Sequence, residues 1–353
     1  MVKERFLKRI KLTSGILSKI AKIDEFKGLW RGSLRLSPQI LGRLKKSVII
    51  TSAGASTRIE GAKIGDEEIA RLLGGLKSRP PKGRDQEEVA GYADLLGRIF
   101  DNYKTLKLSE GQILQFHSLM LKFSKKDQSH RGKYKTVDNI VMARNEKGQQ
   151  IVLFRPTPPY LVKKEIDDIL FWTQKQLEKN ILHPLLVMAN FVFEFLAIHP
   201  FEDGNGRLSR ALTNFLLLKT GYSYTPYVSL EEIVEDGQTD YYLSLRATQK
   251  NHKTKNEDIT PWLDFFLETL IEQTEKAKKL MEKEQPEKLL SEKQLEVYHL
   301  FNKNETLSVL EIDKKLKGKI PKVTIKQALS RLKELRLLER LGQGRSIRYR
   351  NNA

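Results

Sequence analysis

Side chains that can move a proton, bind a cation and hold phosphate lie together in residues 199–210. His199 can accept a proton near neutral pH, and the carboxylate of Asp203 can bind a hard cation such as Mg²⁺. The Gly-Asn-Gly sequence that follows contains glycines, which let an anion approach the backbone closely. Arg207 and Arg210 are three residues apart, so both can lie near one face of a helix. The stretch therefore offers a base, a metal ligand, a phosphate cradle and two cationic groups.

A loop between two helices must hold these side chains. An apolar run over 185–198 precedes the stretch and another over 211–218 follows it, whereas Pro200 and the glycines break helical periodicity. Because the loop passes straight into a helix, free backbone N–H groups at the helix start, with the positive end of the dipole behind them, form an anion site. The alternative is a buried corner between two helices, with a structural histidine and solvated arginines.

The stretch resembles the signature of the Fic family, His-Pro-Phe-x-Asp/Glu-Gly-Asn-Gly-Arg-x-x-Arg, and fills all nine specified positions. The resemblance covers about residues 37–285 and implies a mainly α fold, with a helical Fic core and a β-hairpin flap. It also implies a nucleotidyltransferase, namely a protein adenylyltransferase (AMPylator) that transfers AMP from ATP to a Tyr, Thr or Ser hydroxyl of a protein. Mg²⁺ is the implied cofactor, and the target is another protein or this chain itself.

The resemblance assigns a role to each residue of the motif. It implies His199 as the catalytic base, Asp203 as the magnesium ligand and Arg210 as the group that holds the γ-phosphate of ATP. The backbone amides of the Gly-Asn-Gly sequence, the Asn205 side chain and Arg207 are implied to hold the other anionic oxygens. The implied nucleotide-binding residues are Asp203, Gly204, Asn205, Gly206, Arg207, Leu208, Ser209, Arg210, Tyr241 and Tyr242.

Tyr241 and Tyr242 open another predicted helix. On the residues alone they are two aromatic side chains that pack on the core. The Fic family often places Tyr-Tyr at this point, with the rings near the adenine or ribose. Related members carry Asn seven residues after the second tyrosine, where this chain has Gln249.

The segment from Ser56 to Gly61 ends an earlier predicted helix and by itself is an ordinary helix C-terminus. Beside a Fic motif it resembles the family's inhibitory motif, Ser/Thr-x-x-x-Glu-Gly/Asn. The resemblance implies that Glu60 pairs with Arg210 and occupies the guanidinium that would otherwise hold the γ-phosphate. Ser56 would help to hold the segment in place.

Two β-branched runs, 137–142 and 151–154, flank a turn-like sequence at 145–148 and predict a β-hairpin. By resemblance, this hairpin is the flap that docks the target's backbone beside the reactive phosphate, as an added strand would. That role falls on Val152, Leu153 and Phe154.

The net charge, the cysteine content and the lack of targeting patterns indicate the partners and the cellular compartment to expect. The chain has 353 residues and a formal net charge of +19, which favours a polyanionic partner such as nucleotide or nucleic acid. It has no cysteine, which excludes disulfides, thiolate catalysis and Cys-based zinc sites. The N-terminus lacks a signal-peptide pattern and the apolar run ending at Ile198 is too short to span a bilayer, so a cytoplasmic location without a membrane partner is expected. His117 lies among apolar residues, which favours a packed core histidine over a ligand.

Three regions are predicted: an N-terminal helical region with the inhibitory motif (1–110), a Fic catalytic core (111–285) and a basic C-terminal domain (287–353). Helices over 292–302 and 308–316, a third after Pro321 and a hairpin around 342–345 look like a winged helix-turn-helix. That resemblance implies DNA contacts, and the alternative is a protein-binding or dimerising winged helix. The expected DNA-contacting residues are Lys322, Lys326, Arg331, Arg345 and Arg348.

Two further readings of the whole chain stay open. The same site is also suited to removing AMP from a protein, with Glu60 positioning a water molecule. A protein of another class, a DNA-binding regulator whose Fic core only senses nucleotide, is the third hypothesis, and the intact His199 and Asp203 argue against it. Residues 1–36 are expected to cap the core or to mediate self-association, as in a homodimer.

Overall fold

The computed structural model describes residues 2–32, 38–76, 80–144, 150–283, 290–302 and 305–352. The chain divides into two compact units. The first comprises Met1–Lys27 and Lys46–Thr274, and the second comprises Gly28–Lys45 and Glu275–Ala353. The dividing points fall within helices α2, α3 and α12, so the predicted domain boundaries at residues 110 and 285 stay predictions.

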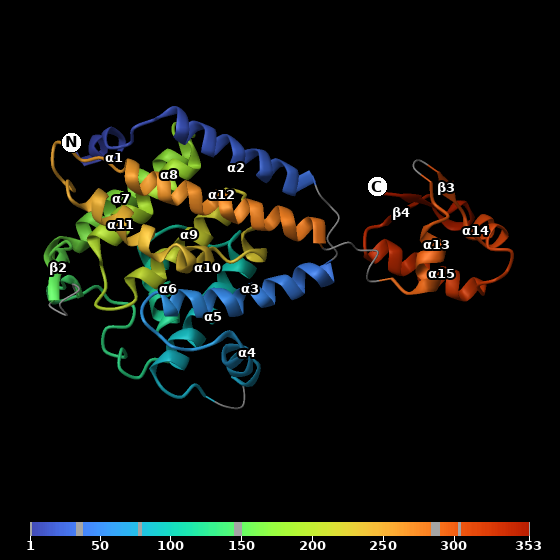
Figure 1. The fold of residues 1–353 in the computed structure, drawn as a ribbon, viewed down its shortest axis with the longest axis horizontal. Coiled ribbons are helices and arrows are strands. Elements are labelled where there is room, and N and C mark those ends of the chain that lie inside the picture. Colours follow the sequence, from blue (N-terminus) through green and yellow to red (C-terminus); the bar gives the residue numbers. More distant parts are fainter. Residues whose placement is uncertain are drawn as a thin grey trace. The chain divides into compact units, whose positions relative to one another are not determined.

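The first unit is mainly helical and carries one two-stranded sheet (Figure 1). Its elements, with the full bounds of the helices that cross the dividing points, are α1 (Val2–Lys8), α2 (Ser14–Gly32), α3 (Pro38–Arg58), α4 (Asp66–Gly75), α5 (Arg84–Asn102), α6 (Glu110–Met120), β1 (Val141–Arg144), β2 (Gln150–Phe154), α7 (Pro159–Lys179), α8 (Pro184–Ile198), α9 (Asn205–Lys219), η1 (Thr225–Tyr227), α10 (Leu230–Asp236), α11 (Gln238–Gln249) and α12 (Thr260–Lys283). This agrees with the predicted mainly α fold.

Helix α8 forms the centre of this unit. Every residue from Leu185 to Ile198 is buried, as expected for a helix that is apolar on all sides. It packs between α7 and α9, and the indole N–H of Trp262 on α12 donates to the carbonyl of Ala189, 2.8 Å away. A helix this firmly enclosed gives the loop that follows it a fixed starting point.

Helix α3 is a single continuous helix from Pro38 to Arg58. Gly54 lies inside it and would favour a break by propensity alone. A Cβ at this position would lie 2.6 Å from Nη1 of Arg58 and 2.7 Å from Ile69, so the glycine makes room for neighbouring side chains. Tertiary packing therefore carries the helix through to Arg58, next to the predicted inhibitory glutamate.

The second unit contains a three-stranded antiparallel sheet with the strand order β3-β5-β4. The elements after residue 284 are α13 (Glu292–Tyr298), β3 (Thr306–Leu307), α14 (Val309–Lys315), α15 (Lys322–Glu334), β4 (Leu338–Leu341), η3 (Gly344–Ser346) and β5 (Arg348–Asn351). Apolar residues from all three helices and from β3 and β4 form one core. The three predicted helices and the hairpin are present, and the resemblance to a winged helix-turn-helix stays a prediction.

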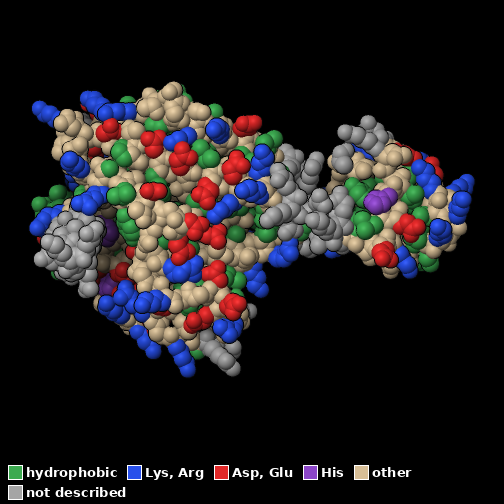
Figure 2. Space-filling view, in the orientation of Figure 1, with side chains coloured by type: hydrophobic (Ala, Val, Ile, Leu, Met, Phe, Trp, Pro, Cys, Tyr) green, Lys and Arg blue, Asp and Glu red, His purple; other side chains and the backbone are tan. Residues whose placement is uncertain are grey.

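Basic and acidic side chains are interspersed over the visible face of each unit (Figure 2). In the part of the chain that the structure describes, no helix has the length and apolar character needed to cross a membrane.

Candidate active site

The motif forms a tight loop between α8 and α9. Helix α8 ends at Ile198, and His199 follows it with a left-handed backbone (φ +52°), which is uncommon for a residue other than glycine. Gly204 is also left-handed (φ +80°) and is the N-cap of α9. The predicted helix–loop–helix is confirmed, with its turns at His199 and Gly204.

The Asn205 side chain closes this loop. Its Oδ1 accepts from the backbone N–H of Phe201 at 2.9 Å, and its Nδ2 donates to the carbonyl of Phe201 at 2.8 Å. In this conformation both polar atoms of the Asn205 side chain hydrogen-bond to the backbone of the loop, whereas the resemblance implied that this side chain contacts phosphate. The backbone N–H groups of Asn205 and Gly206 lie at the start of α9, where N–H groups have no partner within the helix.

His117 supports the loop from α6. Its ring stacks on Phe201 with a centroid distance of 3.8 Å and an interplanar angle of 9°. Its Nδ1 accepts from the N–H of Gly132 at 2.9 Å, so Nε2 carries the proton and donates to the carbonyl of Asp203 at 3.0 Å. Burial lowers the pKa of His117 to about 4, which keeps the ring neutral. The expectation of a packed core histidine is confirmed, but its role in shaping the motif loop was missed.

Asp203 and Arg207 form an ion-pair network with two residues of α5. Arg207 is almost fully buried, and its guanidinium lies 2.8 Å from Asp203 and 3.0 Å from Glu88. Arg84 lies 4.0 Å from Asp203. Burial would raise the pKa of Asp203, but Arg207, the Gly204 N–H and Arg84 outweigh it and hold that pKa below its usual range. Asp203 is therefore an ionised carboxylate, as a magnesium ligand must be.

His199 is placed as a neutral base. Its Nδ1 lies 3.4 Å from the carbonyl of Leu196, which can only accept, so the proton sits on Nδ1 and Nε2 keeps its lone pair. The pKa of His199 is lowered to about 4, mainly by burial, and the nearby Lys135 ammonium contributes to this shift. The carbonyl of Leu196 and the carboxylates of Glu60 and Asp203 oppose this shift without reversing it.

The predicted pair between Glu60 and Arg210 is present. Nη2 of Arg210 donates to Oε1 of Glu60 at 2.8 Å and to the carbonyl of Ser56, also at 2.8 Å. Nε of Arg210 donates to Oγ of Ser56 at 2.9 Å. A Cβ added to Gly206 would lie 2.2 Å from Oε1 of Glu60, so only glycine permits this approach. The Glu60 carboxylate thus lies directly against the start of α9.

The end of the Glu60 segment is held by α10 and α11. The carbonyl of Ile59 accepts from Nε2 of Gln238 at 3.0 Å and from the hydroxyl of Tyr242 at 3.3 Å. Arg58 makes two contacts of 2.6 and 2.9 Å with the carboxylate of Glu235. Tyr242 therefore contacts the segment that carries Glu60 directly, which the sequence did not reveal.

Tyr241 has a different environment from its neighbour. It is buried against Trp262 and Phe265, and it lines a cavity of about 30 Å³ together with Ser209 and Arg210. A cavity of that size holds about one water molecule. Tyr241 thus lines the cavity next to Arg210, whereas Tyr242 is partly exposed.

The predicted hairpin is present as β1 and β2, which pair antiparallel with Met142 opposite Val152 and Ala143 opposite Ile151. Its turn, 145–149, and the side chains of Val152 and Leu153 lie outside the described residues. The ring of Phe154 lies 6.0 Å from the ring of His252.

Most of the basic residues expected to bind DNA have acidic partners within the second unit. Lys322 lies 3.2 Å from Asp313, and Arg331 lies 3.3 Å from Glu334. Arg348 contacts Glu311 at 2.7 Å. Lys326 is exposed, and the Arg345 side chain is outside the described residues. Binding to a duplex would have to replace these intramolecular pairs.

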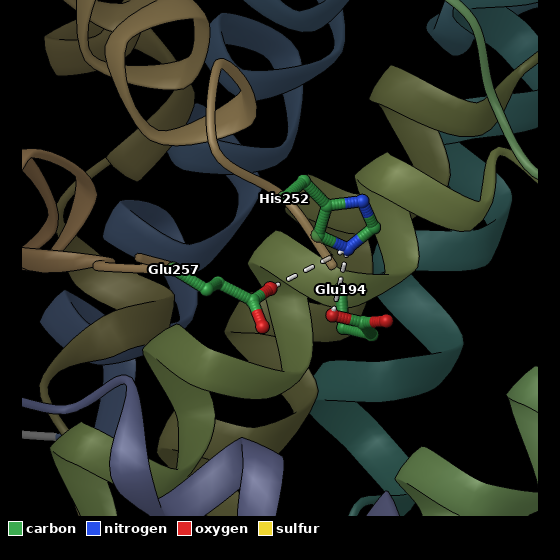
Figure 3. A group of neighbouring side chains, drawn as sticks. All are labelled: Glu194, His252 and Glu257. Carbon is green, nitrogen blue, oxygen red and sulfur yellow. Dashed lines mark hydrogen bonds and ion pairs between the residues drawn. The ribbon is translucent and has the colours of Figure 1, made fainter. Parts of the chain in front are cut away.

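A second group of ionisable side chains lies away from the motif. His252 lies 3.2 Å from Glu194 and 3.8 Å from Glu257 (Figure 3). The same carboxylates also pair with Arg5 and with the fully buried Arg9, whose Nη1 is 2.9 Å from Glu257. Two guanidinium groups already balance the two carboxylates, so the cluster has no excess negative charge to attract a cation. Through Glu194, this cluster links α1 and the residue that follows it to α8.

Residues 107–217 match the model of the Fic/DOC family. A probable protein adenylyltransferase of Aquifex aeolicus is 24% identical over 116 residues, which cover 32% of this chain and 35% of that protein. The protein adenylyltransferase Fic of Drosophila mojavensis is 35% identical over 89 residues, which cover 25% of this chain and 15% of that protein. The chain thus matches about a third or less of the length of these relatives.

Solved structures share the fold over more of the chain. The structure of a Fic family protein from Desulfovibrio desulfuricans aligns over 97% of both chains with a TM-score of 0.64 and 23% identity. A Fic domain containing signaling protein from Bacteroides thetaiotaomicron aligns over 76% of this chain and 97% of its own, with a TM-score of 0.58 and 22% identity. Residues 107–217 thus match the Fic/DOC family model, and these solved structures share the fold of the chain.

Proposed function

We propose that this chain is a protein adenylyltransferase, which transfers AMP from ATP to a hydroxyl side chain of a protein and is autoinhibited by Glu60. The curated relatives that match the Fic domain carry the name protein adenylyltransferase, which supports this activity. The observation that carries the proposal is that Arg210, beside the start of α9, is buried and has a guanidinium nitrogen without a hydrogen-bond partner among the described residues.

Arg210 offers an unused donor to an anion. Its side chain is almost fully buried, and Nη1 has no hydrogen-bond partner among the described residues. That nitrogen lies 3.4 Å from the position that a Cβ on Gly206 would take. A buried guanidinium N–H without a partner is costly. Together with the free amides of α9, it forms a binding site for a phosphate group of ATP.

The transfer step follows from the position of His199. The oxygen of the target hydroxyl attacks the α-phosphorus of ATP, and Nε2 of His199 takes its proton. The bond between the α-phosphorus and the oxygen that bridges to the β-phosphate breaks, and pyrophosphate leaves with that electron pair. The free backbone N–H groups at the start of α9 hold the anionic oxygens.

Asp203 fits the magnesium ion that this reaction class uses. Proteins bind Mg²⁺ through one or two carboxylates together with substrate phosphates, and the side chain of Asp203 is ionised and 35% exposed. When bound, the ion would neutralise charge on the phosphates and on departing pyrophosphate. Arg207 and Glu88 keep the Asp203 carboxylate in place.

Autoinhibition follows from the position of Glu60. Its carboxylate contacts both Arg210 and the Cα region of Gly206. A phosphate oxygen cannot occupy the same space, and the negative charge also repels it. The hairpin strand β2 would bind the backbone of the target protein by strand addition, with Phe154 at its end.

Mass spectrometry of the full chain incubated with ATP and Mg²⁺ tests this proposal. We expect the Glu60→Gly variant to gain the mass of AMP on itself or on added protein, and the same variant with His199→Ala not to gain it. A Glu60→Gly protein that folds and binds ATP but transfers no AMP would refute the activity.

Removal of AMP is a second candidate for the same site, because Glu60 is 36% exposed beside His199 and can orient a water molecule. A protein modified by the Glu60→Gly variant is the substrate for its test. Release of AMP from that protein by the wild type, and not by Glu60→Gly, would establish the removal reaction.

A DNA partner for the second unit is a separate proposal, supported by 16 Lys and Arg against 8 Asp and Glu in residues 287–353. Affinity of the full chain for duplex DNA should then fall steeply with salt, because phosphate contacts release counterions. A lack of duplex binding at low salt would favour the protein-binding alternative.

A further inference from the structure

Two residues outside the motif, Lys135 and Asn139, hydrogen-bond to the backbone of the motif loop. The N–H of Lys135 donates to the carbonyl of Pro200 at 2.9 Å, and Nζ of Lys135 donates to the carbonyl of Ile198 at 3.3 Å. One residue thus holds the peptide that joins Ile198 to His199 and the peptide that follows Pro200. Asn139 accepts from Nζ of Lys135 at 2.7 Å and donates to the carbonyl of Phe201 at 3.1 Å, which links the same lysine to the rest of the loop.

Lys135 is an unusual cation. Lys135 is only 3% exposed, and no carboxylate of a described residue lies within ion-pair distance of its ammonium group. Burial lowers the pKa of Lys135 to about 8, with Lys253 also lowering it and Asp138 and Glu165 opposing the shift. A buried lysine without a paired carboxylate is costly and is found mainly at functional sites. The carbonyl at the end of α8, at the negative end of that helix dipole, is what partly offsets the cost.

His199 needs such support because its backbone is left-handed. A residue with a side chain in this conformation costs about 1–3 kcal/mol and persists only where its surroundings hold it. The two carbonyls that Lys135 binds belong to the residues just before and just after His199. Their orientation determines the direction of the imidazole, and therefore where Nε2 meets a target hydroxyl.

We propose that Lys135 is a positioning residue, which binds the carbonyls of Ile198 and Pro200 on either side of His199 and so orients the imidazole toward the target hydroxyl. The catalytic consequence rests on the proposed adenylyltransferase function, whereas the positioning itself does not. The charged groups that face His199 are Lys135, Glu60 and Asp203, and the first opposes protonation of the ring while the other two favour it. Lys135 therefore also helps to keep His199 in its basic form.

The alternative is that Lys135 only caps the C-terminus of α8. In that case its loss would lower stability and leave the geometry of His199 and kcat unchanged. Because loss of the Lys135 charge raises the pKa of His199 in either case, the two alternatives are separated by kcat and by the titration of a variant that keeps this charge.

The kinetic test uses the full chain in the Glu60→Gly background. Lys135→Met should lower kcat about 10- to 100-fold, because misplacing a catalytic base by about 1 Å costs that much, and should change KM for ATP less than about twofold. Lys135→Arg should recover at least half of kcat on a logarithmic scale, since it can donate to the same carbonyls. Lys133→Met, at an exposed lysine two residues earlier, is the matched control and should keep full activity.

The second test needs no catalysis. NMR titration of the ring of His199, assigned with His199→Ala, should show a higher pKa in Lys135→Met than in the otherwise identical Lys135 protein. Asn139→Ala, which removes the partner of Nζ, should shift it in the same direction by less and serves if Lys135→Met does not fold. An unchanged kcat, or an unchanged His199 titration in a folded variant, would overturn the proposal. If Glu60→Gly itself transfers no AMP, the proposed function fails, and the titration of His199 in Asn139→Ala, which keeps the charge of Lys135, decides this inference.

Discussion

Replacing Glu60 by glycine removes one partner of the Glu60–Arg210 pair. It also removes the carboxylate that lies against Gly206. A hydrogen bond to a charged group contributes about 1.5–3 kcal/mol. The Glu60 side chain is 36% exposed, so solvent screening reduces this to roughly 1–2 kcal/mol. Because 1.4 kcal/mol is a factor of ten, the dissociation constant of ATP should fall roughly 5- to 30-fold in Glu60→Gly, and AMP transfer should rise by at least as much.

The same change should lower stability without nucleotide. Arg210 keeps its contacts with Ser56 but loses its counter-charge while it remains buried. The free energy of unfolding should fall by about 1–3 kcal/mol. Saturating ATP should restore it, because the γ-phosphate takes the place of the carboxylate, so ATP should raise the melting temperature more in Glu60→Gly than in the wild type.

Two further variants separate the causes. Glu60→Gln keeps the side chain against Gly206 but removes its charge, so its ATP affinity should lie between wild type and Glu60→Gly. Arg210→Ala added to Glu60→Gly should abolish the gain, and this non-additivity is expected of two residues that share one site.

Calorimetric titration with ATP and mass spectrometry of the labelled protein are the assays. Equal ATP affinity and equal labelling in wild type and Glu60→Gly would refute the reasoning, because the carboxylate would then exclude nothing. A gain that survives Arg210→Ala would show that the γ-phosphate is held elsewhere.

The remaining predictions concern the base and the loop. His199→Ala should lower AMP transfer by Glu60→Gly roughly 10²- to 10⁴-fold and leave the dissociation constant of ATP within about twofold; unchanged turnover would remove His199 as the base. The pKa of His199 is about 4 with Glu60 present, and Glu60 raises it, so the kcat/KM of Glu60→Gly should stay level as pH falls from 8 to about 5 and decline only near or below pH 4; a decline centred near pH 6.5 would show that burial does not depress this pKa. His117→Phe keeps a ring against Phe201 but leaves the carbonyl of Asp203 and the N–H of Gly132 without their partner, so the free energy of unfolding should fall by about 2–4 kcal/mol in denaturant titration; a smaller loss would mean that water replaces the imidazole.

The features that the sequence alone determined are those written in short, contiguous patterns. Twelve residues contain the base, the carboxylate, the glycines and both arginines, and breaks in apolar periodicity place them between two helices. The hairpin follows from local strand and turn preferences in the same way. The pairing of Glu60 with Arg210 spans 150 residues and was predicted only through the resemblance to a family motif.

The tertiary structure alone decided what surrounds that loop. The carbonyls of Ile198, Pro200, Phe201 and Asp203 are bound by side chains or backbone 62 to 86 residues away, from Lys135, Asn139 and His117. Local periodicity cannot show such pairs, because each depends on which surfaces meet when the helices pack. The burial of Arg207 against Glu88 and of Tyr241 behind Arg210 has the same origin. The sequence therefore supplied the chemical groups of the proposed site, and the packing of distant segments set their orientation and charge state.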